Sequence, residues 1–458
     1  MMRTTHLRAS LLLAAAIGAG ALTAPGSAQA APGTARAAPR ADDPVRAVES
    51  VAHPLRATGP GGSAKDLRPL DRMVGDAEVV GLGEATHGTH EFFTMKDRLF
   101  RHLVEEKGFR TFALEVSWTT GLRLDAYVRG GAGDVRELAR QELARTPWHH
   151  EEYIRLLTWM RAYNERHPDR QVRFMGNDLD HPHLGAELFD AVTDHVRRHR
   201  PDLLGRVEAL YAPIREVPDG DAYLALPLAE RARLAKSARA AYDLVRTAGP
   251  DGHDPAYAWT LQHARSVLQT ADIYAYDVST PEGQRGSMLH RDRIMAENTA
   301  WWQRQTGHKV LVSAHNAHLA YESYDPRYPR MQGEFLRDSY GPKYRSIGFT
   351  FNEGSFMATA PDDEVYAPRT VGAAPRGTNE YTLDKVSYDD YYVDLRTVPR
   401  AARKWLTGKR PTRSIGTAYP DGPYGIRLGP SHDVLIHLHE TTAAHRVEQR
   451  PRARSVNG

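Results

Sequence analysis

Cysteine is absent from this sequence of 458 residues. Its absence excludes disulfide bonds, thiolate metal ligands and a cysteine nucleophile. The fold must therefore be stabilised by a hydrophobic core. A chain of this length can bury a large core and has room for about two or three domains.

An excess of charge of either sign is also absent. The chain has 60 Lys and Arg residues against 57 Asp and Glu residues. Loss of an N-terminal export segment that carries Arg3 and Arg8 would bring the two totals closer still. Such a balance gives no long-range field to attract nucleic acid or an anionic membrane, so we expect neither partner. The oligomeric state is not indicated.

Long apolar runs are absent except near the N-terminus. The run at 11–22 is too short for a membrane span and is followed by the small-residue site Ala28-Gln29-Ala30, which is typical of a secretory signal. We therefore predict a signal peptide at residues 1–30, cleavage after Ala30 and a secreted protein. Residues 31–45 are predicted to be a flexible leader and 444–458 a charged tail, which leaves 46–443 as the folded part.

Three familiar catalytic or nucleotide-binding motifs are missing as well. The sequence has no G-x-S-x-G elbow, which disfavours an α/β-hydrolase serine enzyme. Gly81-Leu82-Gly83 begins like a dinucleotide fingerprint, but Thr86 stands where the third glycine belongs. Thr89 occupies the lysine position of a Walker-like spacing. Nucleotide binding is therefore not supported.

What is present is a series of short apolar runs that alternate with helical patterns. This alternation predicts an α/β fold with a largely parallel central sheet and flanking helices. The predicted strands of the sheet are 77–83, 111–114, 172–176, 309–313 and 345–351, with shorter runs at 391–395 and 434–437.

Residues 184–307 have a different character, with long amphipathic patterns punctuated by proline. We interpret them as a helical insertion between the third and fourth strands that forms a lid or wall over the active-site cleft. The predicted helices are 188–199, 229–247, 257–275 and 291–306.

Ionisable and amide side chains follow each predicted strand of the sheet. In open α/β sheets ligands bind beyond the carboxyl ends of the strands, so these side chains are expected to meet at one edge. The residues concerned are Glu84, His87, Glu115, Asn177, Asp178, Asp180, His315, Asn316, His318, Asn352 and Glu353.

Glu84 and His87 lie on a loop between Gly83 and Gly88, directly after a buried strand. An imidazole accepts a proton near neutral pH, and a neighbouring carboxylate fixes its tautomer. The pair is therefore a candidate for proton transfer. The alternative is that Glu84 caps the next helix and His87 lies on the surface.

His315 and His318 are three residues apart, which puts them on one face of a helical turn. The alternatives are one structural and one exposed histidine, or metal ligands together with an oxygen from Glu84 or Asp178. No H-E-x-x-H motif is present, so we expect no cofactor, with a divalent metal as the minority alternative.

Glu115 ends an apolar strand, where a carboxylate is costly unless it is paired. Lys96 and Arg98 on the intervening predicted helix, or a histidine of the site, are its expected partners. A buried ion pair that fastens helix to sheet and a functional carboxylate are equally compatible with this position.

Taken together, these segments resemble the erythromycin esterase family. The likeness covers about residues 74–442, and GEATHG combined with HNAH is its specific part. It is carried by GLGEATHGTHEFF, the helix with Lys96 and Arg98, FALE, GNDLD, RDRIMAENTAWW and SAHNAHLA.

The resemblance implies a carboxylic ester hydrolase that opens macrolide lactones, a route to antibiotic resistance, without a covalent serine intermediate. It implies that His87 is the base that activates water, with Glu84 beside it and Glu115, His315 and His318 in the same cleft. Expected substrate contacts are Lys96, Arg98, Asp178, Arg291 and Asn316. A metal-dependent hydrolase that uses His87, His315 and His318 as ligands, and a secreted binding protein without turnover, remain alternatives.

Overall fold

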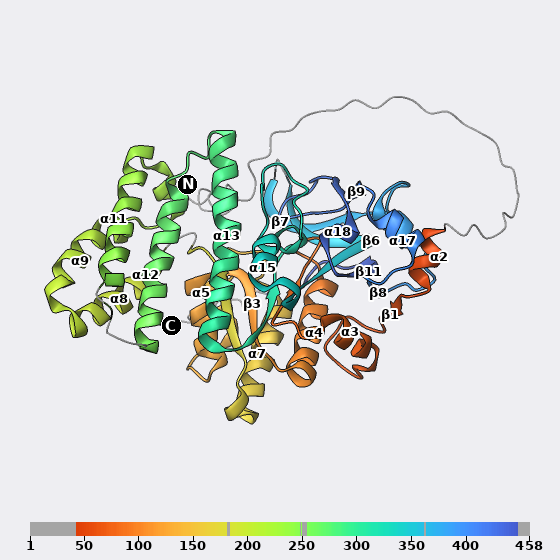
Figure 1. Ribbon diagram of the computed structural model, residues 1–458, viewed down its shortest axis with the longest axis horizontal. Coiled ribbons are helices and arrows are strands. Elements are labelled where there is room, and N and C mark those ends of the chain that lie inside the picture. Colours follow the sequence, from red (N-terminus) through yellow and green to blue (C-terminus); the bar gives the residue numbers. More distant parts are fainter. Residues whose placement is uncertain (1–42, 181–183, 248, 250–253, 361–362, 448–458) are drawn as a thin grey trace, which may run out of the picture.

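The computed structural model describes residues 43–180, 184–247, 249, 254–360 and 363–447. A nine-stranded sheet crosses its centre and has helices on both faces (Figure 1). The predicted signal peptide and its cleavage site lie outside the described residues, as does most of the predicted leader. Among the helices that the structure describes, none is both long and apolar enough to cross a membrane.

The predicted, largely parallel sheet is confirmed. Its parallel strands are neighbours in the order β11, β6, β2, β5, β3 and β4. Their bounds are β2 (Val79–Leu82), β3 (Phe109–Ser117), β4 (Arg173–Asp178), β5 (Lys309–Ser313), β6 (Tyr344–Ala360) and β11 (Val434–Thr441). The antiparallel members are β1 (His53–Pro54), β7 (Asp363–Val371) and β8 (Tyr391–Asp394), while β9 (Arg410–Thr412) and β10 (Tyr424–Ile426) form a separate pair.

Helices fill most of the connections. Before β5 the chain forms α2 (Pro44–Glu49), α3 (Arg68–Val74), α4 (His90–Lys107), α5 (Trp118–Val128), α6 (Val135–Glu142), α7 (Glu151–Arg166), α8 (Ala186–His199), α9 (Pro201–Arg215), α10 (Gly220–Ala225), α11 (Leu228–Thr247), α12 (Pro255–Tyr274) and α13 (Pro281–Thr306). After β5 come α14 (Asn316–Leu319), α15 (Gln332–Tyr340), α16 (Asn379–Leu383), α17 (Arg400–Leu406) and α18 (Leu428–Ser431). Short 3-10 turns occur at Lys65–Leu67, Pro168–Arg170 and Gly341–Lys343.

The sheet separates two cores because successive side chains of a strand point to opposite faces. Val80 and Leu311 belong to the core shared with α3, α4 and α7. Val79 and Val310, their neighbours along the strands, belong to the core shared with α8, α12 and α13. Burial on both faces explains why these strands read as continuous apolar runs.

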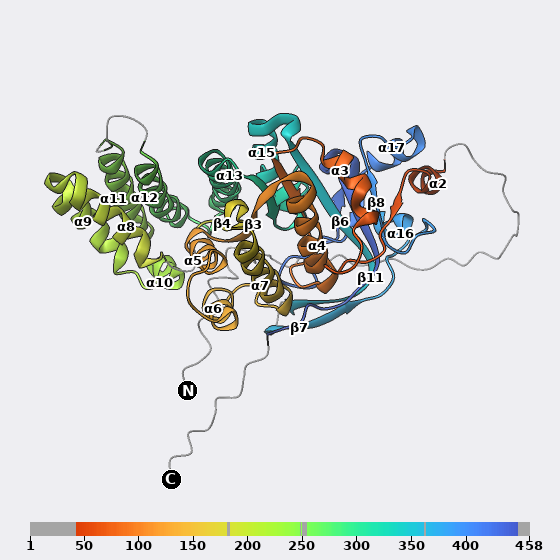
Figure 2. The same cartoon turned by 90° about the horizontal axis from the view of Figure 1, so that it is seen from below.

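The helices of segment 184–307 lie largely beside the sheet. In Figures 1 and 2, α8, α9, α11 and α12 form a group at one end of the molecule, separated from the sheet by α13. Helix α13 starts at Pro281, ten residues before its predicted start, because proline is well tolerated in the first turn. Helix α9 was not predicted; it starts at Pro201 and contains Pro213.

The predicted charged tail is wrong at its first residues. Ala444 is buried, and its backbone N–H donates to the carbonyl of Gly88 at 2.9 Å. Two isolated β-bridges, Thr89 with Ala443 and His150 with Arg446, hold the segment against the starts of α4 and α7. Backbone pairing outweighs the charge pattern that suggested a frayed end.

Candidate active site

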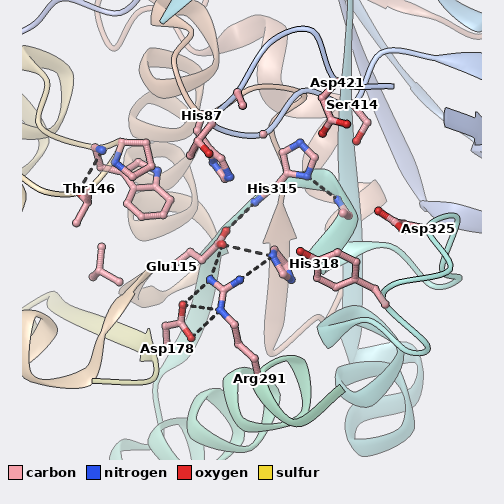
Figure 3. Close-up of a pocket in the computed structure, with 18 of the residues that line it drawn as sticks. His87, Glu115, Thr146, Asp178, Arg291, His315, His318, Asp325, Ser414 and Asp421 are labelled. Carbon is pink, nitrogen blue, oxygen red and sulfur yellow. Dashed lines mark hydrogen bonds and ion pairs between the residues drawn. The ribbon is translucent and has the colours of Figure 1, made fainter. Parts of the chain in front are cut away.

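A cavity of about 210 Å³ lies at the carboxyl ends of four neighbouring strands, β2, β5, β3 and β4. Figure 3 shows that side chains from all four converge on it. Because parallel strands end at one edge of a sheet, residues far apart in sequence meet there. The predicted residues that line it are His87, Glu115, Asp178, Arg291, His315 and His318.

Glu84 and His87 form a buried hydrogen-bonded pair. His87 Nδ1 lies 2.6 Å from Glu84 Oε1, and both residues follow β2 on one turn of loop. The other oxygen, Oε2, accepts from Lys96 Nζ, which also donates to Ser313 Oγ at 2.9 Å. Burial alone would raise the pKa of Glu84, but Lys96 and His87 hold it below its usual range. Glu84 is therefore an anion that orients the His87 ring.

Two glycines let this loop approach its neighbours. A Cβ on Gly83 would overlap Asn316 Oδ1, and one on Gly88 would overlap the backbone of Met357. Neither glycine has a positive φ, so close approach is the reason for glycine here. The loop that carries His87 is thereby packed closely against Asn316 and Met357.

His315 is a neutral hydrogen-bond donor at the cavity wall. It caps α14, and its Nδ1 accepts from the backbone N–H of Ala317 at 3.2 Å. The proton of the neutral ring is therefore on Nε2, which is buried without a partner among the described residues. Burial, and then the nearby His87 and His318 rings, lower the pKa of His315 to about 3. Its ring centre lies 5.1 Å from that of His87.

His318 lies in the opposite electrostatic environment. Its Nδ1 is 2.7 Å from Asp292 Oδ1, and its Nε2 is 3.3 Å from Glu115 Oε1. Burial alone would lower its pKa, but the Asp292 and Glu115 carboxylates outweigh burial and raise it. His318 is therefore favoured as a cation, while His315 stays neutral.

Arg291 joins the carboxylates of two strands. Its guanidinium pairs with Asp178 at 2.5 Å and with Glu115 at 2.9 Å. Glu115 Oε2 also accepts from the backbone N–H of His315 at 3.1 Å. Burial would raise the pKa of Glu115, but His318 and Arg291 lower it well below its usual range. The network holds β3, β4, α13 and the loop after β5 in register.

Three expected substrate contacts are absent from the cavity lining. Arg98 faces away and pairs with Asp66 at 2.7 Å, so its assignment was wrong. Asn316 clamps β6 instead, with its amide donating to the Phe349 carbonyl at 2.7 Å. Lys96 lies beneath the site, where its charge is used by Glu84. Helical periodicity alone does not say which face of α4 meets the sheet edge.

The fifth predicted cluster of polar residues does not reach the cavity either. Strand β6 continues past Asn352 and Glu353, so these residues lie within a strand rather than after one. Asn352 Oδ1 accepts from the backbone N–H of Ala374 at 2.9 Å. Asp180 is also turned away, where it accepts from the backbone N–H of Thr119 at 2.8 Å.

Loops, rather than the helical insertion, form most of the cavity wall. Of segment 184–307, only Arg291 on α13 lines the cavity, so a lid made by α8 to α12 is not found in the described residues. Trp148, Tyr324 and Tyr328 line it instead. Trp148 meets His87 edge-on, with ring centres 5.4 Å apart. These aromatic residues lie in irregular segments that carry no periodic pattern, and sequence reasoning missed them.

Asp292 follows Arg291 directly in RDRIMAENTAWW, and the sequence left open whether it faces the cleft or packs against the sheet. It is fully buried and accepts both from His318 and from the backbone N–H of Gln332 at 2.8 Å. The sign available in the sequence was an acidic residue directly after a predicted site arginine.

Two of the three site histidines, His315 and His318, fit a metal ion poorly. His318 directs one nitrogen at Asp292 and the other at Glu115. His315 uses its Nδ1 lone pair for a backbone N–H, which leaves a proton on Nε2. Metal ligation requires a lone pair on each ring. The contacts of His315 and His318 therefore favour hydrogen bonding over coordination.

The chain is similar to known hydrolases over most of its length. The sequence model described as erythromycin esterase matches residues 104–441, which include Glu115, Arg291, His315 and His318. The erythromycin esterase type II of Escherichia coli is 26% identical over 376 residues, which cover 76% of this chain and 87% of that protein.

Solved structures share the fold. A crystal structure described as a succinoglycan biosynthesis protein is 31% identical with a TM-score of 0.78, and the match covers 88% of this chain and 98% of that one. A mutant of the erythromycin esterase EreC in its open conformation has a TM-score of 0.67 at 16% identity, with 86% and 98% covered. The chain belongs to the erythromycin esterase family, a family of hydrolases.

Proposed function

We propose that this protein hydrolyses a carboxylic ester or lactone with water activated by His87. The observation that carries the proposal is the buried pair of His87 Nδ1 and Glu84 Oε1, 2.6 Å apart, at the wall of the cavity. With Nδ1–H held by an anionic carboxylate, Nε2 is left with a lone pair for a water proton.

His315 is suited to the next step. When water attacks the carbonyl carbon, negative charge develops on the carbonyl oxygen, and a fixed N–H donor near that oxygen lowers the barrier. The neutral ring of His315 carries such a donor on its buried Nε2, which has no partner among the described residues. The proton taken by His87 then passes to the leaving alkoxide, which gives an alcohol and a carboxylic acid that loses its own proton to solvent.

His318 and Arg291 would act as positioning residues. Their charges are already matched by Asp292, Glu115 and Asp178, so neither is a free cation for an anionic substrate. A cavity of about 210 Å³ is below the roughly 300–1,000 Å³ of common ligand sites. We infer a substrate whose bulk lies outside the cavity mouth.

The test is hydrolysis by the purified protein of macrolides, simple lactones and acyclic esters, with release of acid as the readout. His87→Asn should lower kcat/KM by about 10²- to 10⁴-fold, the usual contribution of a general base. The assay is run with and without chelator, because the proposed chemistry requires no metal. Near-normal turnover by His87→Asn would refute the assignment.

His102→Asn is the matched control. His102 is equally buried, lies on α4 and pairs with a carboxylate, with its Nε2 2.7 Å from Asp71 Oδ1. It does not line the cavity. Loss of this pair should affect stability and leave kcat/KM within about twofold of the parent. Tight binding of an ester by the parent chain without any product would support a binding protein instead.

The proposal includes export. It is supported by the sequence of residues 1–30, with its apolar run at 11–22 and its small-residue site before Ala31. N-terminal sequencing of protein recovered from the culture medium should begin at Ala31. A chain that retains Met1 inside the cell would contradict this part.

A further inference from the structure

A second group of imidazole and carboxylate ligands lies outside the cavity lining. His90 is the first residue of α4, Glu152 lies in the first turn of α7, and His445 lies in residues 442–447, here called the C-terminal strap. One potential ligand atom from each lies within 4.8 Å of the others. In the part of the chain that the structure describes, this is the one group of three or more His, Asp or Glu residues that meets this criterion.

The geometry of this His–Glu–His cluster is compact. Glu152 Oε1 lies 2.5 Å from His90 Nδ1 and 3.0 Å from His445 Nδ1. The two imidazole centres are 4.5 Å apart. Both Nδ1 atoms thus face the same carboxylate, from segments that are more than 60 residues apart in sequence.

We propose that the cluster is a binding site for a divalent transition metal of the zinc type, separate from the active site. Zinc takes two imidazole nitrogens and a carboxylate that binds through one or both oxygens, with water completing its coordination. Tetrahedral ligand atoms at zinc distances lie about 3.3 Å apart, so the three side chains need to open by less than about 1 Å. The side chain of His445 is 56% exposed, which leaves room for the ion and a water to enter.

An unpaired buried oxygen supports the proposal independently. The side chain of Glu152 is 1% exposed, yet its Oε2 has no hydrogen-bond partner among the described residues. A buried carboxylate oxygen without a partner is costly, and a metal ion would satisfy it when the Glu152 carboxylate binds through both of its oxygens. A histidine cluster held only by hydrogen bonds would leave that oxygen unpaired.

The position of the cluster gives the ion a structural role. The C-terminal strap crosses the starts of α4 and α7, and the backbone N–H of Glu151 donates to the His445 carbonyl at 2.8 Å. His90 comes three residues after His87, and Glu152 comes four after Trp148 at the cavity wall. An ion at the cluster would fasten the strap to both segments. This role does not depend on which reaction the cavity performs.

The test uses the untagged chain, dialysed against buffer with a slight excess of Zn²⁺ and then against metal-free buffer. Elemental analysis should find about one zinc per chain. The zinc-loaded protein should melt several degrees higher than the chelator-treated protein, because an ion that binds only the folded state stabilises it. His90→Gln, Glu152→Gln and His445→Gln should each lose the zinc and the shift in Tm.

His167→Gln is the matched control, since His167 stacks on Tyr163 and belongs to no such cluster. It should keep one zinc. His445→Gln is the most informative variant because the exposed ring can be replaced without disturbing the core, and circular dichroism checks that it folds. Equal zinc content in the parent and the three cluster variants would mean an adventitious ion only. Zinc lost on His318→Gln but kept by the cluster variants would place the ion in the cavity, and either result overturns the proposal.

Discussion

The buried pair of Glu84 and Lys96 provides a test that separates stability from catalysis. Their side chains are 0% and 1% exposed, so neither charge has water to compensate it. Removal of one partner of such a pair typically costs about 3–5 kcal/mol, because the other charge stays buried and unpaired. Glu84→Gln leaves the Lys96 cation with Ser313 Oγ at 2.9 Å, so we expect a loss near 3 kcal/mol.

The double variant Glu84→Gln/Lys96→Met removes both charges and keeps the volume. Neutral replacement of a whole buried pair is often close to neutral in stability, so the double variant should be at least about 2 kcal/mol more stable than Glu84→Gln. Its activity should not recover, because His87 still lacks the carboxylate that fixes its tautomer. We expect kcat/KM to stay about 10²- to 10⁴-fold below the parent in both variants.

Urea unfolding gives the free energies of unfolding of the parent, of Glu84→Gln, of Lys96→Met and of the double variant. Ester hydrolysis by the same samples gives kcat/KM. A double variant no more stable than Glu84→Gln would show that the pair is not electrostatically coupled. Recovery of activity in the double variant would refute the role assigned to Glu84.

Three further predictions concern other parts of the site. The pKa of His318 is raised in the folded state, so its protonated ring stabilises the fold below pH 6.5. This contribution is lost as the pH rises through the folded-state pKa. In urea unfolding, the stability difference between the parent and His318→Gln should therefore be larger at about pH 6 than at about pH 9.5. Gly83→Ala should cost about 1–3 kcal/mol and lower kcat/KM, because the new methyl group overlaps the side chain of Asn316, and thermal melts with activity assays check both effects. Arg291→Met and Arg98→Met should each lower the free energy of unfolding in urea by about 3–5 kcal/mol, since both arginines are paired with buried carboxylates. Only Arg291→Met should change kcat/KM. Equal activity losses in the two variants would contradict the placement of the cavity.

The sheet was predictable because its central strands are buried on both faces. All seven predicted strands are found, and the edge at which β2, β3, β4 and β5 end was predicted from the polar residues near their ends. Segment 201–215 shows the limit of this reasoning. An internal Pro213 argued against a helix there, yet packing of Val207, Tyr211 and Ile214 stabilises α9. Tertiary burial outweighed local propensity.

The sequence indicated which strands carry the site residues. It indicated less well in which direction their side chains point. Glu84, His87 and His315 follow strands closely and Glu115 lies near the end of β3, so strand order alone brings them together. Arg98 lies on a helix, where its direction depends on how α4 packs. The cavity walls at Trp148 and Tyr328 come from irregular loops, whose paths follow from contacts distant in sequence. No periodic pattern encodes those contacts.

The two histidines of HNAH show how one motif yields two chemical states. A helical turn was expected to place them on one face, but His315 precedes α14 as its N-cap and His318 lies inside the helix. Burial keeps the His315 ring neutral, and the capping bond from Ala317 occupies its Nδ1 lone pair, which leaves the proton on Nε2. Asp292 from α13, together with Glu115, instead raises the pKa of His318 and favours its charged form. The backbone position of His315 thus makes it a neutral donor that faces the cavity, and a distant carboxylate favours the charged form of His318 in the cavity wall. The three-residue spacing in the sequence indicates neither the backbone position nor the carboxylate.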